Sequence, residues 1–435
     1  MSSFNNGIFK KPIFFLFEHG KKTKEMFSLP LTPALTIYVG ILWVIPIAMI
    51  SPFRSLYLVS LGLSNTEVGL YSFMFIPFGL VALWLGGYLA DVWGRKKTLF
   101  LFDVLSWGGY CFCMTFAENK WWGAAALFFI ALNLGSGPAY QCLLIEGVSS
   151  VKRAVGYSVL QIINLAPGLL FFPLLGGYWK EQRGLSTACH EMFGLFFVCV
   201  ALGITIRAVF IPHSGAFERV PPTWKHGIKE GLEQYLNTFK NLLRKKAAVP
   251  FLASKILDEW VFATWIIYAS LYFVQHMGVK DTSLSLFAQV SAYVACGLLF
   301  FVVPRLSPQW MVKLLGLDQV FGLAALAVLL IPPVGFLTPF WICLLSVILG
   351  AMGSSFYYSV SAAIWMSIIG EQERAKVVAV STTIFQLGVW ILGSLSAFLY
   401  GHVSAAALLL FIMSARVIDF FLLRRVVVAL QSPGS

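Results

Sequence analysis

Long apolar runs constrain this chain more than any other feature. Runs of about 20 or more residues, each long enough to cross a bilayer as a helix, follow one another along the 435 residues. A helix also satisfies its own backbone hydrogen bonds in lipid. We therefore predict twelve transmembrane helices, at residues 34–59, 66–90, 98–117, 122–146, 154–178, 192–212, 250–275, 282–303, 310–332, 339–368, 376–400 and 403–424.

The composition agrees with a membrane protein. Hydrophobic residues make up 59% of the chain and charged residues only 11%, against about 25% charged in ordinary soluble proteins. The period-two alternation of a membrane β-barrel is absent. The predicted fold class is therefore all-α integral membrane.

The cysteines and histidines do not form the patterns of a metal site or a redox motif. Seven cysteines occur, all but Cys189 lie inside apolar runs, and no Cys-x-x-Cys is present. The six histidines are scattered. Nucleophile elbows and phosphate-binding glycine loops are also missing, so we expect no metal, no cofactor and no enzyme activity.

Lysine and arginine residues predict the orientation. With the N-terminus inside the cell, 23 of the 31 cations fall on the cytoplasmic side and four on the outer side. Positively charged loops stay in the cytoplasm, so we expect both termini to be cytoplasmic in the cell (inner) membrane. The net charge of +12 sits at span ends and does not indicate nucleic-acid binding.

The longest polar stretch, residues 213–249, divides six predicted spans from six. It carries apolar residues at helical spacing among lysines and arginines, which is typical of an amphipathic helix in the headgroup region; a solvated linker helix fits equally well. The predicted organisation is a cytoplasmic tail (1–33), a first bundle (34–212), this linker, a second bundle (250–424) and a C-terminal tail (425–435).

The two predicted bundles share charged positions. Asp103 follows Lys97 by six residues, and Asp318 follows Lys313 by five. Arg153 and Arg374 precede the fifth and eleventh spans in similar contexts. The pattern indicates a parallel internal repeat.

A charged turn joins the second and third spans. It reads Gly87-x-x-x-Asp91-x-x-Gly94-Arg95-Lys96. Asp91 lies at the carbonyl end of a predicted helix, where a carboxylate is unfavourable unless a cation answers it. Arg95 is the expected partner, and the two glycines allow a close approach or a sharp turn.

This turn resembles the signature loop of the major facilitator superfamily of secondary transporters. The resemblance implies two six-helix bundles and alternating access. It also implies a charge cluster of Asp91, Arg95 and Glu146, which Arg153 would join, close to the positive N-terminus of the eleventh span. Such a cluster would latch the cytoplasmic side in the outward-facing state.

Two further segments resemble family signatures in part. The fifth span contains Gly168-x-x-x-Phe172-Pro173-x-x-Gly176-Gly177, similar to an antiporter pattern with Phe172 where glycine is usual. The fourth span resembles the drug/proton exporter motif, but Ala131 stands in place of its arginine. Antiport is therefore one expectation among the alternatives below. Because Ala131 replaces the arginine of the exporter motif, coupling to protons would need a different titratable residue.

Charges inside spans each cost roughly 2.5–3.5 kcal/mol on insertion scales, so each needs a role. Lys255, Asp258 and Glu259 lie at helical spacing on one face and form a candidate coupling site or an interfacial salt bridge. Arg54 is a candidate for an outer clasp with Glu67, for an anionic substrate group or for snorkelling. For the peripheral spans we expect structural pairing among Asp103, Arg207, Asp318, Arg416 and Asp419.

Polar and aromatic residues on the cavity-lining spans suit an amphipathic substrate. The candidate substrate residues among them are Gln141, Gln161 and Asn164. We expect a monomeric exporter of a small amphipathic organic molecule, with protons as the candidate exchanged ion and the lipid bilayer as its surroundings. Uptake of an organic solute by symport and uncoupled lipid translocation are the alternatives.

Overall fold

The structure is a computed structural model of the chain. It describes residues 29–146, 160, 163–164, 167–168, 170–212, 237, 239–244, 247–299, 316–368 and 374–431. The elements of regular structure in these ranges are helices. The all-α prediction is confirmed there.

Within the described residues, eight helices are long and apolar enough to cross a membrane. They are Leu31–Ile50, Asn65–Val92, Arg95–Thr115, Lys120–Leu144, Leu185–Phe210, Ala248–His276, Val380–Val403 and Ala405–Ala429. Shorter apolar helices occupy Ser283–Gly297, Leu317–Val328 and Pro339–Ser355.

Several predictions fall on residues outside the described ranges. They include the N-terminal tail, most of the linker with its amphipathic pattern, and the first part of the fifth span. The count of twelve helices therefore stays a prediction.

The first half of the chain follows the predicted spans but divides most of them into shorter helices. The elements are α2 (Leu31–Tyr38), α3 (Ile41–Ile50), α4 (Arg54–Ser60), α5 (Asn65–Met74), α6 (Ile76–Val92), α7 (Arg95–Asp103), the π-helical turn η3 (Val104–Gly108), α8 (Gly109–Thr115), α9 (Lys120–Ala131), the 3₁₀ turn η4 (Leu132–Ser136), α10 (Gly137–Ile145), α12 (Phe172–Arg183) and α13 (Leu185–Phe210).

Prolines and capping residues explain where these helices break. Pro77 lies in the first turn of α6, where its missing N–H costs least, and so the helix restarts after Met74. Pro138 holds the same place in α10, directly after η4. Ser64 and Glu67 form a reciprocal capping box at the start of α5.

The second half contains longer helices. They are α15 (Ala248–Leu271), continued by the π-helical turn η5 (Tyr272–His276), then α16 (Ser283–Gly297), α18 (Leu317–Val328), α19 (Pro339–Ile368), α20 (Arg374–Phe398) with the turn η9 (Leu399–Val403), and α21 (Ala405–Gln431).

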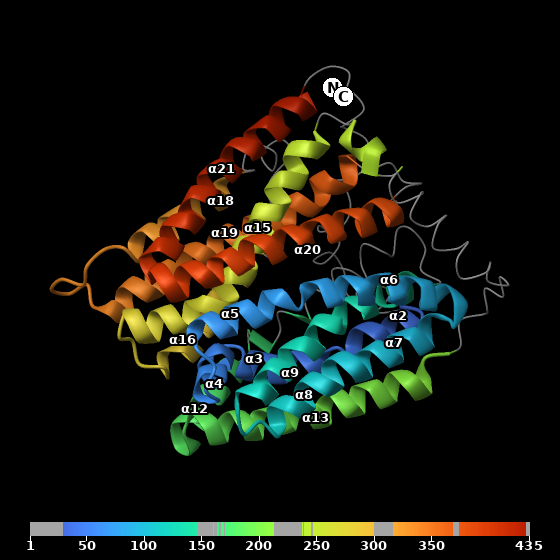
Figure 1. Ribbon diagram of the computed structural model, residues 1–435, viewed down its shortest axis with the longest axis horizontal. Helices are drawn as coiled ribbons and strands as arrows, with labels where there is room; N and C mark the ends of the chain where they lie inside the picture. Colours follow the sequence, from blue (N-terminus) through green and yellow to red (C-terminus); the bar gives the residue numbers. More distant parts are fainter. Residues whose placement is uncertain are drawn as a thin grey trace, which may run out of the picture.

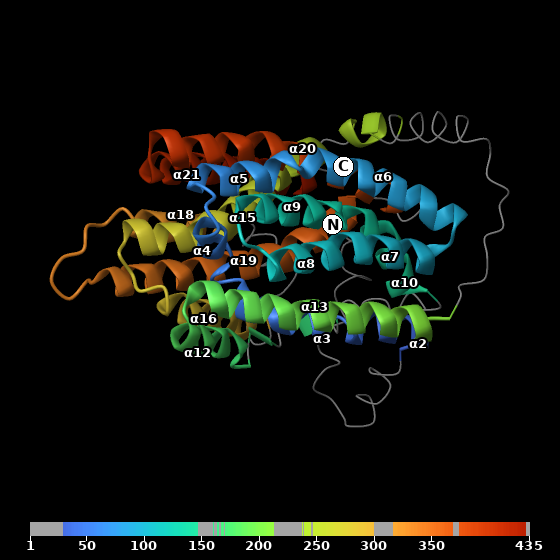
Figure 2. The same cartoon turned by 60° about the horizontal axis from the view of Figure 1, so that its bottom comes forward.

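The two halves of the chain occupy different parts of the molecule. Helices α2–α13 lie mostly below and α15–α21 mostly above in Figure 1, and the two sets run alongside each other in Figure 2 as well. Between the halves, α5 packs on α20 and α12 packs on α16. The halves are thus joined through the second and eleventh, and the fifth and eighth, predicted spans.

Large apolar side chains face outward along the helices. Trp84, Val198 and Phe421 are each more than half exposed. An extensive apolar surface of this kind is rare on a soluble protein, and it is the surface that contact with lipid requires.

An ion pair is buried within the first half. Arg207 Nη1 on α13 donates to Asp103 Oδ2 on α7 at 3.0 Å, and Nη2 donates to the Thr36 carbonyl at 3.0 Å. The guanidinium also lies 4.4 Å from the centre of the Trp43 ring. The predicted structural role of Asp103 and Arg207 agrees with this geometry, since one cation meets one carboxylate.

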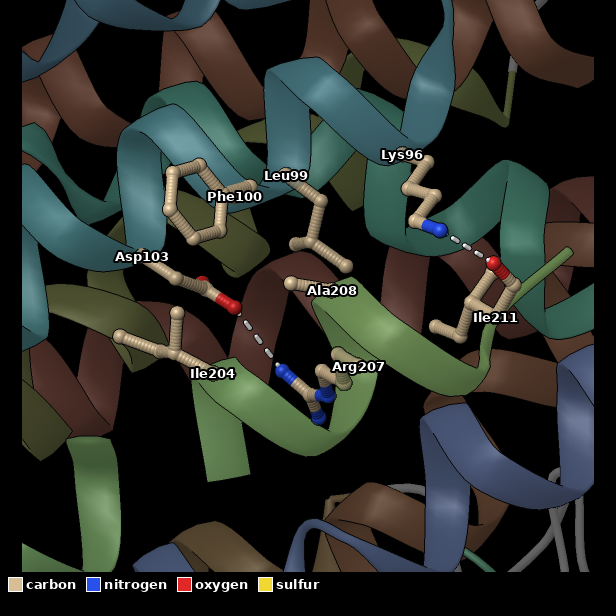
Figure 3. A pocket seen from close by; sticks show the side chains of 8 residues that line it. All are labelled: Lys96, Leu99, Phe100, Asp103, Ile204, Arg207, Ala208 and Ile211. Carbon is tan, nitrogen blue, oxygen red and sulfur yellow. Dashed lines mark hydrogen bonds and ion pairs between the residues drawn. The ribbon is translucent and has the colours of Figure 1, made fainter. Parts of the chain in front are cut away.

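A small void adjoins this pair, as Figure 3 shows. Its volume is about 10 Å³, which is close to the minimum for one water molecule. The void is therefore a packing defect beside the ion pair rather than a ligand site.

Replacing one partner of this pair should destabilise the fold. In Asp103→Asn, Arg207 keeps its charge without a counter-ion, which costs about 3–5 kcal/mol for buried pairs. We expect a lower midpoint of thermal unfolding in detergent. The double variant Asp103→Leu/Arg207→Met should regain most of the loss, and an unchanged midpoint in the single variant would contradict the structural role.

Candidate functional site

The charged turn between α6 and α7 takes its shape from one glycine. Gly94 has φ of +92°, a backbone conformation that residues with a Cβ rarely adopt. The Thr98 hydroxyl donates to the Gly94 carbonyl at 3.1 Å and stabilises the start of α7. The expected sharp turn is thus made at Gly94.

Close helix packing, by contrast, is the role of Gly86 and not of Gly87. A Cβ on Gly86 would lie 1.9 Å from the Gly135 carbonyl oxygen, whereas a Cβ on Gly87 would meet nothing within 4 Å. The expectation of a close approach at Gly87 is therefore wrong for this conformation. Glycine at position 87 leaves open space beside α6.

The cations of the turn bond within the first half of the chain. Arg95 Nη1 lies 3.7 Å from Glu146 Oε1 at the end of α10. Lys96 Nζ donates to the Ile211 carbonyl at 2.5 Å, which ties α7 to the end of α13 (Figure 3). Asp91 is exposed, and Arg153 lies outside the described residues. We name this region, Asp91–Lys97 with Glu146 and Ile211, the motif end.

Polar contacts between the halves gather toward the opposite end, which we name the distal end (residues 61–65, 180–184, 277–282 and 401–404). The Asn65 and Gln275 amides exchange hydrogen bonds of 2.7 and 3.3 Å. Lys180 of α12 pairs with Asp281. The two halves are therefore held together at the distal end, and in Figure 1 they diverge toward the motif end at the right.

The candidate group Lys255, Asp258 and Glu259 divides into two sets. Lys255 Nζ lies 3.4 Å from Glu259 Oε1. Asp258 instead accepts a 2.9 Å hydrogen bond from Arg416 Nη1 on α21. The expectation that one lysine would serve both carboxylates is wrong for Asp258, because a guanidinium from another helix approaches more closely.

Arg416 is the centre of a buried polar cluster. Its Nη1 also donates to Gln319 Oε1 at 2.9 Å, and Gln319 Nε2 donates to Asp318 Oδ2 at 2.5 Å. Asp419, three residues after Arg416, does not pair with it: both Asp419 carboxylate oxygens are buried without a hydrogen-bond partner. The expected structural pair of Arg416 and Asp419 is therefore not formed.

A cavity of about 440 Å³ adjoins this cluster. Asp258, Asp318 and Arg416 form its charged corner. Most of its remaining wall is apolar or aromatic and comes from α15, α16, α18 and α19, including Val261, Phe262, Trp265, Ile266, Phe287 and Leu326. The cavity thus combines an apolar surface with a few charged groups, which is the usual composition of a ligand site.

Arg54 does not form the outer clasp that the sequence left open. Glu67 bonds to Lys120 at 3.2 Å and caps α5, while Arg54 lies beside Tyr110 of α8. Arg54 is also absent from the wall of the cavity, where the first span contributes Ser51 and Pro52.

The remaining candidates lie apart from the cavity. Gln141 and Asn164 are exposed, and Gln161 falls outside the described residues. The predicted site residues do not include Gln319, Gln275 or Asp281. A glutamine directly after an aspartate inside an apolar run was the available signal for Gln319.

Comparison with known proteins identifies the family. The sequence model of the Major Facilitator Superfamily matches residues 36–391. The chain is 28% identical over 176 residues to a multi-drug resistance efflux pump PmrA homolog of Lactococcus lactis, covering 38% of this chain and 40% of that protein. It is 27% identical over 171 residues to multidrug resistance protein MdtG of Serratia proteamaculans, covering 38% and 41%. The chain thus matches about two fifths of the length of these curated relatives.

Solved structures share the fold at low sequence identity. A peptide transporter superposes with a TM-score of 0.68 at 14% identity, over 92% of this chain and 94% of that one. The nucleoside transporter NupG gives 0.66 at 14% identity, over 90% and 99%. The human organic anion transporter MFSD10 gives 0.64 at 13% identity, over 91% and 100%.

The signature turn, the helical fold and the match over most of the chain lead to one conclusion: this multi-pass membrane protein belongs to the Major Facilitator Superfamily of transporters.

Proposed function

We propose that this chain exports a small amphipathic organic molecule by alternating access, in exchange for protons. The observation that carries the proposal is the cavity of about 440 Å³, lined mainly by the second half, with an apolar wall and a charged corner. Two partial relatives support export: one is named a multi-drug resistance efflux pump homolog and the other a multidrug resistance protein. A single chain supplies the whole pathway in this proposal, and the protein acts as a monomer of two six-helix bundles.

The cavity suits an amphipath for a physical reason. Aromatic and aliphatic side chains such as Trp265 and Phe287 remove apolar ligand surface from water. The ion pair of Asp258 and Arg416 at the corner offers both an acceptor and donors to a polar end. A highly charged ligand, such as a sugar phosphate, would lose its hydration against the apolar wall without enough partners.

The motif end acts as the latch of the alternating cycle in this proposal. Among the described residues, the polar contacts between the halves gather toward the distal end, and in this proposal the conformation is the one with the motif end open. In the other conformation, Asp91 would meet the positive N-terminus of α20, and the open space beside Gly87 would admit the approaching half. Arg95, bonded to Glu146, would stabilise the Asp91 carboxylate.

We place the motif end and both termini on the cytoplasmic side of the cell membrane. The positive-inside distribution of 23 cations against four supports this orientation. A reporter that is active only in the cytoplasm, fused after Ser435, should be active. An inactive reporter in a transport-competent fusion would contradict the orientation.

Proton-driven export predicts that a pH gradient moves substrate uphill. We expect purified protein in proteoliposomes to accumulate fluorescent amphipathic dyes when a proton gradient is imposed in the export direction. A protonophore should abolish the accumulation but leave downhill exchange. Accumulation in the same direction as proton flow would indicate symport, and equilibration insensitive to the protonophore would indicate an uncoupled translocator; either result would contradict the proposal.

The latch predicts a specific effect of charge removal at the motif end. In Asp91→Asn we expect the initial transport rate to fall about tenfold, equivalent to about 1.4 kcal/mol lost from the closed motif end. Lys97→Gln changes an exposed cation of the same turn and should transport within about twofold of wild type, since exposed charges contribute little. Equal rates in Asp91→Asn and wild type would remove the latch.

A further inference from the structure

The buried cluster around Arg416 holds more negative groups than positive ones. Asp258, Asp318 and Asp419 are 6%, 3% and 1% exposed. Arg416 bonds to Asp258 and interacts electrostatically with Asp318 and Asp419. The nearby cation Lys255 is paired with Glu259. If all three aspartates were ionised, the cluster would carry a net charge of −2 away from water, which is strongly unfavourable.

The internal repeat provides the comparison. In the first half, Arg207 meets Asp103 of the third span and a backbone carbonyl, that of Thr36, on the first span. In the second half, Arg416 reaches the equivalent helices, but Asp258 supplies a carboxylate where Thr36 supplies a carbonyl. Three residues after each arginine, the first half has Phe210 and the second has Asp419. The excess carboxylates therefore occur in one half only.

The hydrogen bonds distinguish the three aspartates. Asp258 accepts from Arg416, and Asp318 accepts from Gln319. Asp419 accepts from neither: both of its oxygens are buried without a hydrogen-bond partner. The Ser254 hydroxyl is close enough to Asp419 to act as a donor, but it does not meet hydrogen-bond geometry in this conformation. A buried ionised carboxylate without a donor is far more costly than a protonated one.

Arg416 also has an unused hydrogen-bond donor. Its Nε is buried without an acceptor, and residues three apart on a helix lie on one face within reach of each other. Gly322 leaves room beside the guanidinium, because a Cβ there would lie 3.1 Å from Nε. An ionised Asp419 could therefore take Arg416 from Asp258 by a movement of one side chain.

We propose that Asp419 is a proton-binding residue and that its ionisation transfers Arg416 from Asp258, on the cavity wall, to Asp419. Protonated Asp419 leaves the Asp258–Arg416 pair intact at the corner of the cavity. Loss of the proton makes Asp419 the stronger partner and frees the Asp258 carboxylate toward the cavity. The proton moves to solvent or to a group in the cavity, and no covalent bond to carbon changes.

Polar and charged residues near Asp419 come from three helices. They are Ser254, Lys255, Asp258 and Glu259 on α15, Asp318 and Gln319 on α18, and Arg416 on α21. The described side chains of the neighbouring α19 and α20, residues 339–355 and 380–398, include no charged residue. This inference rests on the proposed proton exchange and assigns the exchanged proton to Asp419. Its test does not require the exported molecule.

Infrared difference spectroscopy of the full-length protein in nanodiscs tests the proposal. Between about pH 5 and about pH 9, wild type should show a protonated-carboxyl band that fades as the pH rises. Asp419→Asn, which resembles the protonated side chain, should lose that band and keep its unfolding midpoint. Glu118→Gln, at an exposed carboxylate, should keep the band, and choline in place of sodium should not alter it.

A second variant tests the transfer of Arg416. In Asp258→Asn the competing carboxylate is gone, so the band should fade at a pH lower by about one unit or more, as expected when a cation becomes available. An unchanged band in Asp419→Asn would overturn the assignment of the proton to Asp419. In Asp258→Asn, a band that fades at the same pH as in wild type would overturn the transfer of Arg416. Failure of dye accumulation in wild type, with these bands as expected, would instead overturn only the proposed export.

Discussion

The cost of burying charge inside an apolar helical protein governs this structure. Each ionised side chain within a span must find a partner, because lipid and packed apolar groups supply none. The first half meets this requirement with one arginine, one aspartate and a backbone carbonyl between α7, α13 and α2. The second half gathers three aspartates around one arginine. The first half thus buries one carboxylate with one arginine, whereas the second half buries three carboxylates near one arginine.

This difference connects the interior of the second half to the cavity. Asp258 belongs both to the Arg416 cluster and to the cavity wall. A change in the partner of Arg416 therefore changes the charge that a ligand meets. The proposed latch at the motif end lies in the first half, where Arg95 pairs with Glu146 and Lys96 ties α7 to the end of α13. In our proposal the second half senses protons, and the first half carries one of the gates.

The sequence predicted the helices far better than the partners of the charges. Apolar runs and prolines located the described spans, because span length and backbone satisfaction depend on local sequence. The Gly94 turn was equally local. The predicted pairing of Lys255 is correct for Glu259, which lies four residues on in the same helix. It is wrong for Asp258. The partner of Asp258 lies 158 residues away, and only the packing of α21 on α15 brings it there. Likewise, the sequence predicts close packing at Gly87 rather than at Gly86, because a helix that is apolar all round does not indicate which of its sides faces η4.

In our proposal the two ends of the molecule open and close in alternation under proton control. Double electron–electron resonance on a cysteine-free background measures this directly. One label pair joins Lys97 of the motif end to Arg425 in the last turns of α21, and another joins Glu118, between α8 and α9, to Lys280 of the distal end; all four positions are exposed. We expect two distances for each pair, with the Lys97–Arg425 distance shortening as the Glu118–Lys280 distance lengthens, and populations that shift with pH. A single distance for each pair that does not change with pH would contradict it.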